Sequence, residues 1–380
     1  MQFRDLGKQY QVLKADIDKA MITVAANSHY IMGPQMKELE QELATYTGVK
    51  HCLTCANGTD ALTLALKAWG IGNGDAVFVP DFTFFASAEV VALEGATPVF
   101  VDVDDTTYNI DANSLEKAIQ RTLAEGKLKP RVIVAVDLFG LPANYPLVRA
   151  IANKYNLLIL EDGAQGFGGS ITNFGESSTS VRKACSFGDI STTSFFPAKP
   201  LGCYGDGGAV FTNNDEWAQL MNSYRVHGKG TDKYDNVRIG MNSRLDTIQA
   251  AILQVKLHVF DEEVVRVNKA AQQYTQLLKD KVKTPIIPEG FGSSWAQYTI
   301  QLPNETKRNQ LQAALKEAGI PSMVYYPKPM HSQTAFNNVQ SDCENYVSNR
   351  LCATVLSLPM HPYIESSEIE HICSVLIASL

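Results

Sequence analysis

Short apolar runs alternate with amphipathic segments over the first 250 residues. The apolar runs, at 76–80, 98–101, 132–136 and 157–160, are each bounded by turn residues or charges, which predicts strands. The amphipathic segments between them, such as 61–69, 114–123 and 145–155, predict helices. Buried strands separated by helices indicate a mostly parallel sheet that is covered on both faces. Ligands bind such a sheet beyond the carboxyl ends of its strands.

The last third of the chain has a different organisation. Apolar residues keep a rough helical spacing from Leu245 to about Leu278, which predicts one long connecting helix. Residues 295–302 are typical of a strand, and 307–318 and 367–377 are typical of helices. With about 150 residues to a domain, we expect a large domain over 1–255 and a smaller C-terminal α/β domain over 256–380.

Composition narrows the class of protein. The 380 residues are 45% hydrophobic and 19% charged, which excludes a disordered chain and predicts a sizeable core. Forty acidic residues against 33 basic ones give a net charge of -7, which disfavours a nucleic-acid partner. Seven scattered cysteines indicate reduced thiols in the cytoplasm. Because no apolar run approaches the length of a membrane span and no signal peptide is evident, we expect a soluble cytoplasmic enzyme without a membrane partner.

Two loops that follow strands could bind a planar phosphorylated ligand. In the first, at 55–62, a small-residue turn opens a helix, which leaves free backbone N–H groups that suit an anion such as phosphate. An ordinary helix N-cap is the alternative. The second loop, at 81–87, is rich in aromatic residues. One of them could stack on a ring, although core packing of the next helix is the favoured explanation from the sequence alone.

Two further loops carry a carboxylate and a lysine. Asp162 ends an apolar strand, where it could pair with a protonated ring nitrogen or cap a helix. Lys199 lies among small and apolar residues before a glycine-rich turn. A desolvated lysine has a lowered pKa and can form a Schiff base, whereas a surface lysine is the plainer alternative. Together, the four loops supply the groups that hold pyridoxal phosphate (PLP).

The ordered motifs Asn57–Leu62, Glu161–Gln165, Ser194–Lys199, Gly205–Gly208 and Asn242–Asp246 resemble those of the DegT/DnrJ/EryC1/StrS sugar aminotransferases. The resemblance covers essentially the whole chain. It implies fold type I of the PLP-dependent enzymes, which resembles aspartate aminotransferase. In that fold, a mixed, mostly parallel seven-stranded sheet is accompanied by a smaller C-terminal α/β domain. It also implies a homodimer with shared active sites.

The resemblance assigns a role to each candidate residue. Lys199 would join the cofactor (PLP, or PMP in its amine form) covalently, and Asp162 would pair with the pyridine nitrogen. The other cofactor contacts it implies come from Gly58, Thr59, Asp60, Phe84, Gln165 and Ser194, and from Asn242 of the neighbouring subunit. The polar stretch from Thr172 to Ser186 is longer than the family leads us to expect and predicts a loop near the site.

A basic segment suggests the substrate. Between Tyr224 and Arg244, five basic residues outnumber two acidic ones on an acidic protein, which fits a diphosphate better than a nucleic acid. A solvated face is the alternative. Within the family, the chain most resembles the branch that aminates C3 of UDP-2-acetamido-2-deoxy-hex-3-uluronic acid for bacterial lipopolysaccharide (O-antigen) biosynthesis. The substrate-binding residues would be Lys229, Arg244, Tyr325, Tyr326 and His331.

The donor expected from the resemblance is L-glutamate, which leaves as 2-oxoglutarate. That branch has His-Tyr where this chain has Tyr325-Tyr326, so C4 amination of a UDP- or dTDP-linked 4-keto-6-deoxy sugar is the alternative. A non-catalytic dimer acting as a binding module is an alternative of another class. His51, Cys52 and Cys55 have the spacing of half a zinc site, but strand alternation explains them better. No Gly-x-Gly-x-x-Gly motif follows the first strands, which disfavours a dehydrogenase.

Overall fold

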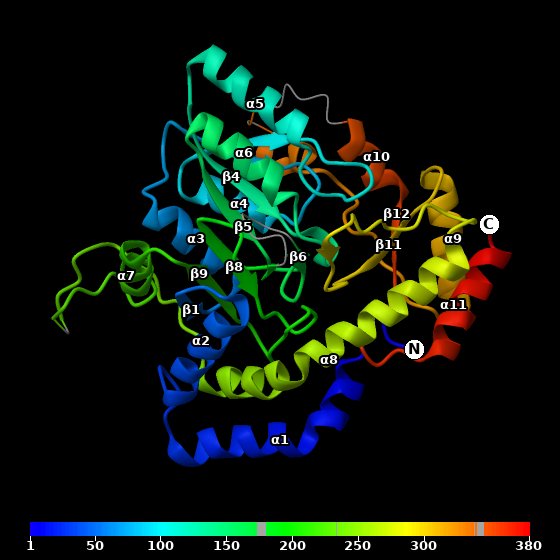
Figure 1. The fold of residues 1–380 in the computed structure, drawn as a ribbon, viewed down its shortest axis with the longest axis horizontal. Helices are drawn as coiled ribbons and strands as arrows, with labels where there is room; N and C mark the ends of the chain where they lie inside the picture. Colours follow the sequence, from blue (N-terminus) through cyan, green and yellow to red (C-terminus); the bar gives the residue numbers. More distant parts are fainter. Residues whose placement is uncertain (173–179, 233, 338, 340–345) are drawn as a thin grey trace.

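The central element is a seven-stranded mixed sheet. A computed structural model describes residues 1–172, 180–232, 234–337, 339 and 346–380 (Figure 1). The strand order is β1 (His51–Cys55), β9 (Gly208–Thr212), β8 (Ile190–Ser194), β5 (Leu158–Asp162), β4 (Lys129–Val136), β2 (Asp75–Pro80) and β3 (Thr97–Val101). β9 is antiparallel to both of its neighbours, and the remaining pairs are parallel. The predicted fold class is therefore confirmed.

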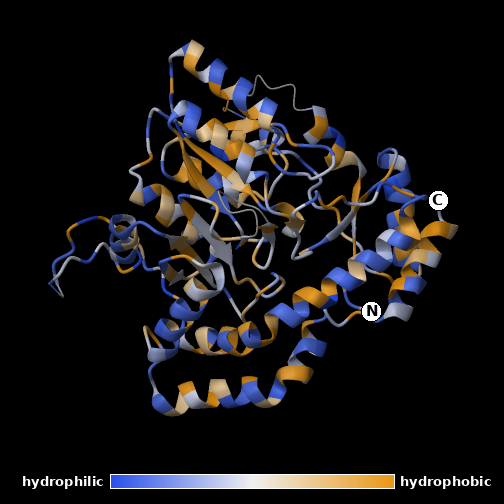
Figure 2. Ribbon diagram, in the orientation of Figure 1, coloured by the Kyte–Doolittle hydropathy of each residue, from blue (hydrophilic) through white to orange (hydrophobic). Residues whose placement is uncertain are grey.

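Alternation along each strand builds two cores. In β4, Val132 and Val134 pack on one face, whereas Ile133 and Ala135 pack on the other. The first face is covered by α3 (Gly58–Ala68) and α4 (Ala86–Leu93), and the second by α5 (Ala112–Glu125) and α6 (Tyr145–Tyr155). Figure 2 shows the hydrophobic residues concentrated in these central strands. Burial on both faces explains why the strands have continuous apolar sequences.

The C-terminal part has a core of its own. β11 (Tyr298–Gln301) pairs with β12 (Val355–Leu358), and α9 (Glu305–Glu317), α10 (Tyr346–Thr354) and α11 (Ser366–Ala378) accompany them. The predicted strand over 295–302 is shorter in the structure because Trp295 has a positive φ of 48°. The apolar cluster there runs from residue 267 to residue 376. The domain division at residue 255 stays a prediction.

One long helix links these parts. α8 (Thr247–Leu278) packs against α1 (Leu6–Asn27) and α2 (Pro34–Thr47), and also against α11 (Figure 1). This confirms the long helix predicted from Leu245 to Leu278. Two short strands, β6 (Ser170–Thr172) and β7 (Val181–Lys183), form a small sheet with β10 (Phe291–Gly292). The stretch predicted as a loop from Thr172 to Ser186 thus begins at the last residue of β6 and contains β7. Residues 173–179 of this stretch lie outside the described residues. No described helix is long and apolar enough to cross a membrane.

Candidate active site

The four loops identified in the sequence meet at one edge of the sheet. They follow β1, β2, β5 and β8, which run parallel to one another, so their carboxyl ends point the same way. Pocket-forming loops at this edge are the usual ligand site of such a sheet. The four loops therefore lie together at the carboxyl ends of the strands, where the sequence predicts a ligand site.

The first loop forms a tight junction with the end of β8. The Asn57 side chain caps α3 by accepting a hydrogen bond from the Asp60 N–H at 2.8 Å. A Cβ atom added to Gly58 would lie 2.7 Å from Cβ of Ser194, so only glycine fits there. The N–H groups of Gly58 and Thr59 precede the first intrahelical bonds and lie beside the Ser194 hydroxyl. These groups form an anion cradle at the positive end of a helix.

Asp162 is buried at the end of β5, and its carboxylate has a defined environment. The Ser87 hydroxyl donates to Oδ2 at 2.7 Å, and the Ala164 N–H donates to Oδ1 at 3.2 Å. Thr83 in turn lies 3.1 Å from the Ser87 hydroxyl. Sequence reasoning missed Ser87 and Thr83, although their spacing of four residues in a strand-end loop was a usable signal. These donors stabilise the negative charge that a protonated ring nitrogen would need opposite it.

Gln165 connects this carboxylate loop to the C-terminal part of the chain. Its side-chain oxygen accepts from the Phe139 N–H at 2.7 Å, and its amide donates to the Tyr326 hydroxyl at 3.0 Å. The Tyr326 ring lies 6.1 Å from the ring of Phe84, which is 54% exposed. Burial and the Asp162 charge raise the pKa of Tyr326 and keep its hydroxyl protonated. Phe84 therefore has a free face available for stacking.

Lys199 lies in the loop between β8 and β9. Its backbone N–H donates to the Phe196 carbonyl at 2.8 Å, which closes a tight turn. Desolvation lowers the pKa of Lys199, while the nearby Asp162 carboxylate opposes this shift. Both residues belong to the same end of the sheet, because Asp162 ends β5 and Lys199 follows the neighbouring strand β8. A lysine with a lowered pKa has more of the neutral amine that can attack a carbonyl carbon.

Two basic side chains donate hydrogen bonds to backbone carbonyls of the lysine loop. The Lys256 amine, on α8, is buried and donates to the Gly202 carbonyl at 2.6 Å. Arg4 donates to the Pro200 carbonyl at 3.1 Å. Burial lowers the pKa of Lys256 to about 8. Neither contact could be predicted from the sequence, because the partners are backbone atoms distant along the chain.

A buried acid pair supports the same strand end. The Glu161 carboxylate accepts from the Phe187 N–H at 2.6 Å and from the Ser191 hydroxyl at 2.7 Å. Asp137 accepts from the Tyr145 hydroxyl at 2.8 Å and also interacts with Glu161. Burial raises the pKa of both carboxyl groups. The pair therefore retains a proton above the usual titration range of a carboxyl group.

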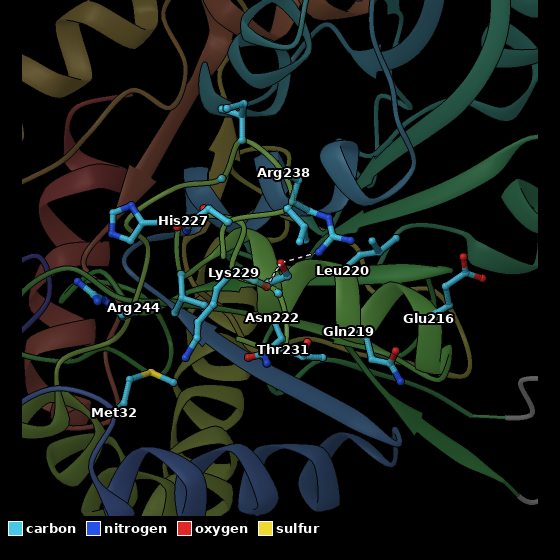
Figure 3. A pocket seen from close by; sticks show the side chains of 17 residues that line it. Met32, Glu216, Gln219, Leu220, Asn222, His227, Lys229, Thr231, Arg238 and Arg244 are labelled. Carbon is cyan, nitrogen blue, oxygen red and sulfur yellow. Dashed lines mark hydrogen bonds between the residues drawn. The ribbon is translucent and has the colours of Figure 1, made fainter. Parts of the chain in front are cut away.

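The remaining predicted site residues lie apart from this cluster. Arg244 and Lys229 line a groove of about 1460 Å³ with His227 and Arg238, and Figure 3 shows these four side chains around it. Glu216 is the acidic residue among the described groove residues. Asn242 is exposed and accepts a hydrogen bond from Arg244. The groove contains neither Lys199 nor Asp162, so one chain alone does not bring the two groups together.

The structure corrects the predicted basic segment at one residue and shows how the predicted sugar loop is held. Arg225 is buried, with Nη1 2.6 Å from both the Glu40 carboxylate and the Thr54 carbonyl, so it does not belong to the basic groove. Lys233 lies outside the described residues. His331 has its ring nitrogen Nδ1 2.6 Å from the Asp81 carboxylate, which raises its pKa. This contact ties the sugar loop to the aromatic loop after β2.

The half zinc site predicted as an alternative is absent from the described part of the chain. Cys52 and Cys55 are buried in β1, which pairs with β9, and both are free thiols. His51 instead contacts Asp215 at 2.6 Å. Among the described residues, no group of three or more His, Cys, Asp or Glu side chains could hold a metal ion. Cys52 packs in one apolar cluster and Cys55 in another, so the two thiols lie on opposite faces of β1.

With this geometry established, the family can be assigned. The model of the DegT/DnrJ/EryC1/StrS aminotransferase family matches residues 11–377. The chain belongs to that family. This aminotransferase is 42% identical to UDP-2-acetamido-2-deoxy-3-oxo-D-glucuronate aminotransferase of Pseudomonas aeruginosa, covering 99% of each chain. It is 39% identical to UDP-N-acetyl-3-dehydro-alpha-D-glucosamine 3-aminotransferase of Acidithiobacillus ferrooxidans, covering 99% of this chain and 97% of the relative.

Solved structures agree with the fold. A family member from Brucella abortus superimposes with a TM-score of 0.95 at 49% identity, covering 99% of this aminotransferase and 98% of that chain. The ntda protein of Bacillus subtilis, solved with bound cofactor PMP, gives a TM-score of 0.86 at 26% identity, covering 97% and 82% of the two chains. Because relatives named as aminotransferases match almost its whole length, this protein is an enzyme.

Proposed function

We propose that this aminotransferase uses PLP to move an amino group from L-glutamate to C3 of UDP-2-acetamido-2-deoxy-hex-3-uluronic acid. The observation that carries the proposal is the meeting of Lys199, Asp162 and the Gly58–Ser194 cradle at one sheet edge. The cradle suits the phosphate of the cofactor, Asp162 suits its ring nitrogen, and Lys199 suits its aldehyde. When bound, the cofactor supplies an electron-accepting ring.

The residues of the chain then have distinct tasks. Asp162, fixed by Ser87, holds a proton on the ring nitrogen. Gln165 and Tyr326, which share a hydrogen bond, line the same side of the site. The lowered pKa of Lys199 suits it to move a proton between the substrate carbon and the cofactor carbon. Phe84, whose ring is exposed beside Tyr326, would stack on the ring of the bound cofactor.

A first test removes the lysine. Lys199→Ala should lose the visible absorbance of covalently held cofactor together with all turnover. Lys67→Ala is a matched control. Lys67 lies in the last turn of α3, where it pairs with Glu94, away from the predicted cofactor contacts. Full turnover in Lys199→Ala would overturn the assigned role.

The substrate assignment rests on relatives and on the basic groove. Both curated relatives described above carry names that specify a UDP-linked sugar modified at C3. Lys229 and Arg244 give the groove the positive charge that suits a diphosphate. The test is a panel of UDP- and dTDP-linked 3-keto and 4-keto sugars, incubated with glutamate and analysed by mass spectrometry. Amination of only a 4-keto-6-deoxy sugar would reject the C3 assignment.

A homodimer with shared sites completes the proposal. The segment between α7 (Asp215–Tyr224) and α8 projects from the body of the protein (Figure 1). It exposes Tyr234, Val237 and Ile239, the last by 90% of its surface. An exposed apolar set of this kind suits burial against a second copy. Asn242 and Arg244 lie on the same segment and would then reach the partner's cofactor site.

Complementation tests the shared site. Lys199→Ala and Arg244→Ala should each be inactive alone. Co-expressed, they should form hybrid dimers that recover about one quarter of the activity, because each hybrid retains one intact site. Absence of recovery in a verified dimer would show that Arg244 acts within its own chain. The proposal places the enzyme in the cytoplasm and in O-antigen biosynthesis, in keeping with its buried free thiols.

A further inference from the structure

Arg4 is a cation without an acidic partner beside the proposed catalytic lysine. It is partly buried, and its one hydrogen-bond acceptor among the described residues is the Pro200 carbonyl at 3.1 Å. None of the ion pairs in the described part of the chain includes it. A guanidinium group has five N–H donors in a rigid fork, so most of the donors of Arg4 remain available.

The segment that carries Arg4 lies between two loops of the site. The Phe3 ring contacts the Tyr325 ring at 6.2 Å, and the Phe3 carbonyl accepts from the Met360 N–H at 3.1 Å. On the other side, Arg4 contacts the lysine loop at Pro200. Figure 1 shows the N-terminus beside α8 and the chain that precedes α11. Arg4 is therefore held between the predicted sugar loop and Lys199.

Arg4 is close enough to the lysine loop to affect its charges. It acts electrostatically on Lys199 and on Lys256, and both effects lower the pKa of the amine. Burial lowers the pKa of Arg4 itself to about 10, and the charge of Glu263 opposes that shift. At neutral pH the guanidinium therefore keeps its positive charge.

Glu263 is not a direct partner, because no ion pair or hydrogen bond joins it to Arg4 among the described residues. The Gln9 amide donates to both Glu263 oxygens, at 2.9 and 3.1 Å, and the Tyr363 hydroxyl donates at 2.6 Å. Arg4 is thus a partly buried cation without a contacting anion. A bound molecule can supply that anion.

We propose that Arg4 binds a carboxylate of a substrate and so helps to determine which molecules the enzyme accepts. The inference rests on the proposed function. A planar guanidinium binds a carboxylate through two parallel hydrogen bonds, and a position between the sugar loop and Lys199 puts that carboxylate next to the reacting atoms. Two sources share this chemistry: glutamate, through its α- or γ-carboxylate, and the uronate group of the sugar.

The test compares substrates with and without the carboxylate in each half-reaction. The holoenzyme, Arg4→Met and Arg4→Lys are mixed with L-glutamate, 4-aminobutyrate or L-glutamine, and conversion of the cofactor is followed by its absorbance. The second half-reaction compares the 3-keto uronate with the corresponding 3-keto sugar that has a hydroxymethyl group. Arg131→Met is the control, because Arg131 pairs with Asp75 at the amino-terminal end of the sheet. Binding of glutarate by calorimetry adds a measurement that does not depend on turnover.

Arg4→Met should slow one half-reaction by about 30-fold or more, and only for the substrate that carries the recognised carboxylate. Loss confined to the amino donors, with weaker glutarate binding, identifies the donor carboxylate. A loss of rate confined to the 3-keto uronate identifies the uronate carboxylate of the sugar. Equal loss with every substrate would make Arg4 a support for the lysine loop and overturn the proposal, as would no loss at all. Wild-type enzyme without a visible cofactor band would instead refute the proposed function.

Discussion

A methyl group added at Gly58 tests the anion cradle directly. In Gly58→Ala the new Cβ would lie 2.7 Å from Cβ of Ser194 and 3.2 Å from its hydroxyl. Unstrained carbon contacts are about 3.5–4.0 Å, so the helix start or Ser194 must move. Overpacking of this kind costs about 1–3 kcal/mol, and the better helix propensity of alanine offsets up to about 1 kcal/mol. The expected net loss of folding stability is about 1–2 kcal/mol.

The same displacement should weaken cofactor binding. Loss of one hydrogen bond to a charged phosphate is worth about 2 kcal/mol, which is roughly a 30-fold increase in the dissociation constant. Cofactor affinity is measured from the visible absorbance during titration, and stability from urea unfolding. Gly72→Ala is the matched control, because its nearest contact would be a carbonyl oxygen at 3.6 Å. In Gly58→Ala combined with Ser194→Gly, stability should recover while affinity does not. Unchanged affinity in Gly58→Ala would refute the cradle.

Three further predictions concern buried polar groups. Ser87→Ala removes the 2.7 Å donor to Asp162 and should weaken cofactor binding by about 1.5–3 kcal/mol. Asp137→Asn removes a carboxyl group whose pKa is raised beside Glu161. The folded wild type keeps a proton that the unfolded chain has lost, so its stability falls as pH rises above about 4, and the variant should lessen that fall. Burial lowers the pKa of His361 to about 4. The unfolded chain therefore binds a proton before the folded chain does, so wild-type stability should fall as pH drops from about 6.5, by about 3 kcal/mol in total. His361→Phe should remove this fall.

Each of these has a clear measurement. Titration of the apoenzyme with cofactor tests Ser87→Ala, and an affinity equal to that of the wild type would dismiss the donor. Urea unfolding between pH 4 and pH 9 tests the other two variants. Parallel stability curves for Asp137→Asn and the wild type would mean that Asp137 is ionised in the folded state. An undiminished acid-side loss in His361→Phe would assign that loss to other groups.

The sequence predicted the apolar strands well and the polar strand poorly. β2, β3, β4 and β5 were visible as apolar runs because both of their faces are buried. β8 has the sequence Ile-Ser-Thr-Thr-Ser, which gives no such signal. It is buried because its hydroxyls have partners: Thr192 donates to the Glu161 carbonyl and Thr193 to the Gly163 carbonyl, each at 3.0 Å. Those partners are distant along the chain.

The candidate site was predictable to a similar extent. Lys199 and Asp162 could be identified because each stands out against its neighbours in a strand-end loop. Lys256 could not, since its role depends on a pairing that only the folded chain creates. Ser87 left one signal, its spacing of four residues from Thr83 in a strand-end loop. The predicted diphosphate patch included Arg225, which the fold instead buries against Glu40. A local count of charges does not show which side chains point inward.

The long helix α8 has a consequence for how the two parts of the chain are joined. Its 32 residues form one continuous rod of about 48 Å. Ala250 and Phe260 belong to the apolar cluster beneath the sheet, while Val267 and Tyr274 belong to the C-terminal cluster. A sharp bend in this helix would disturb the packing of both clusters at once. The helix therefore couples the two parts of the chain, so that a change at one end is felt at the other.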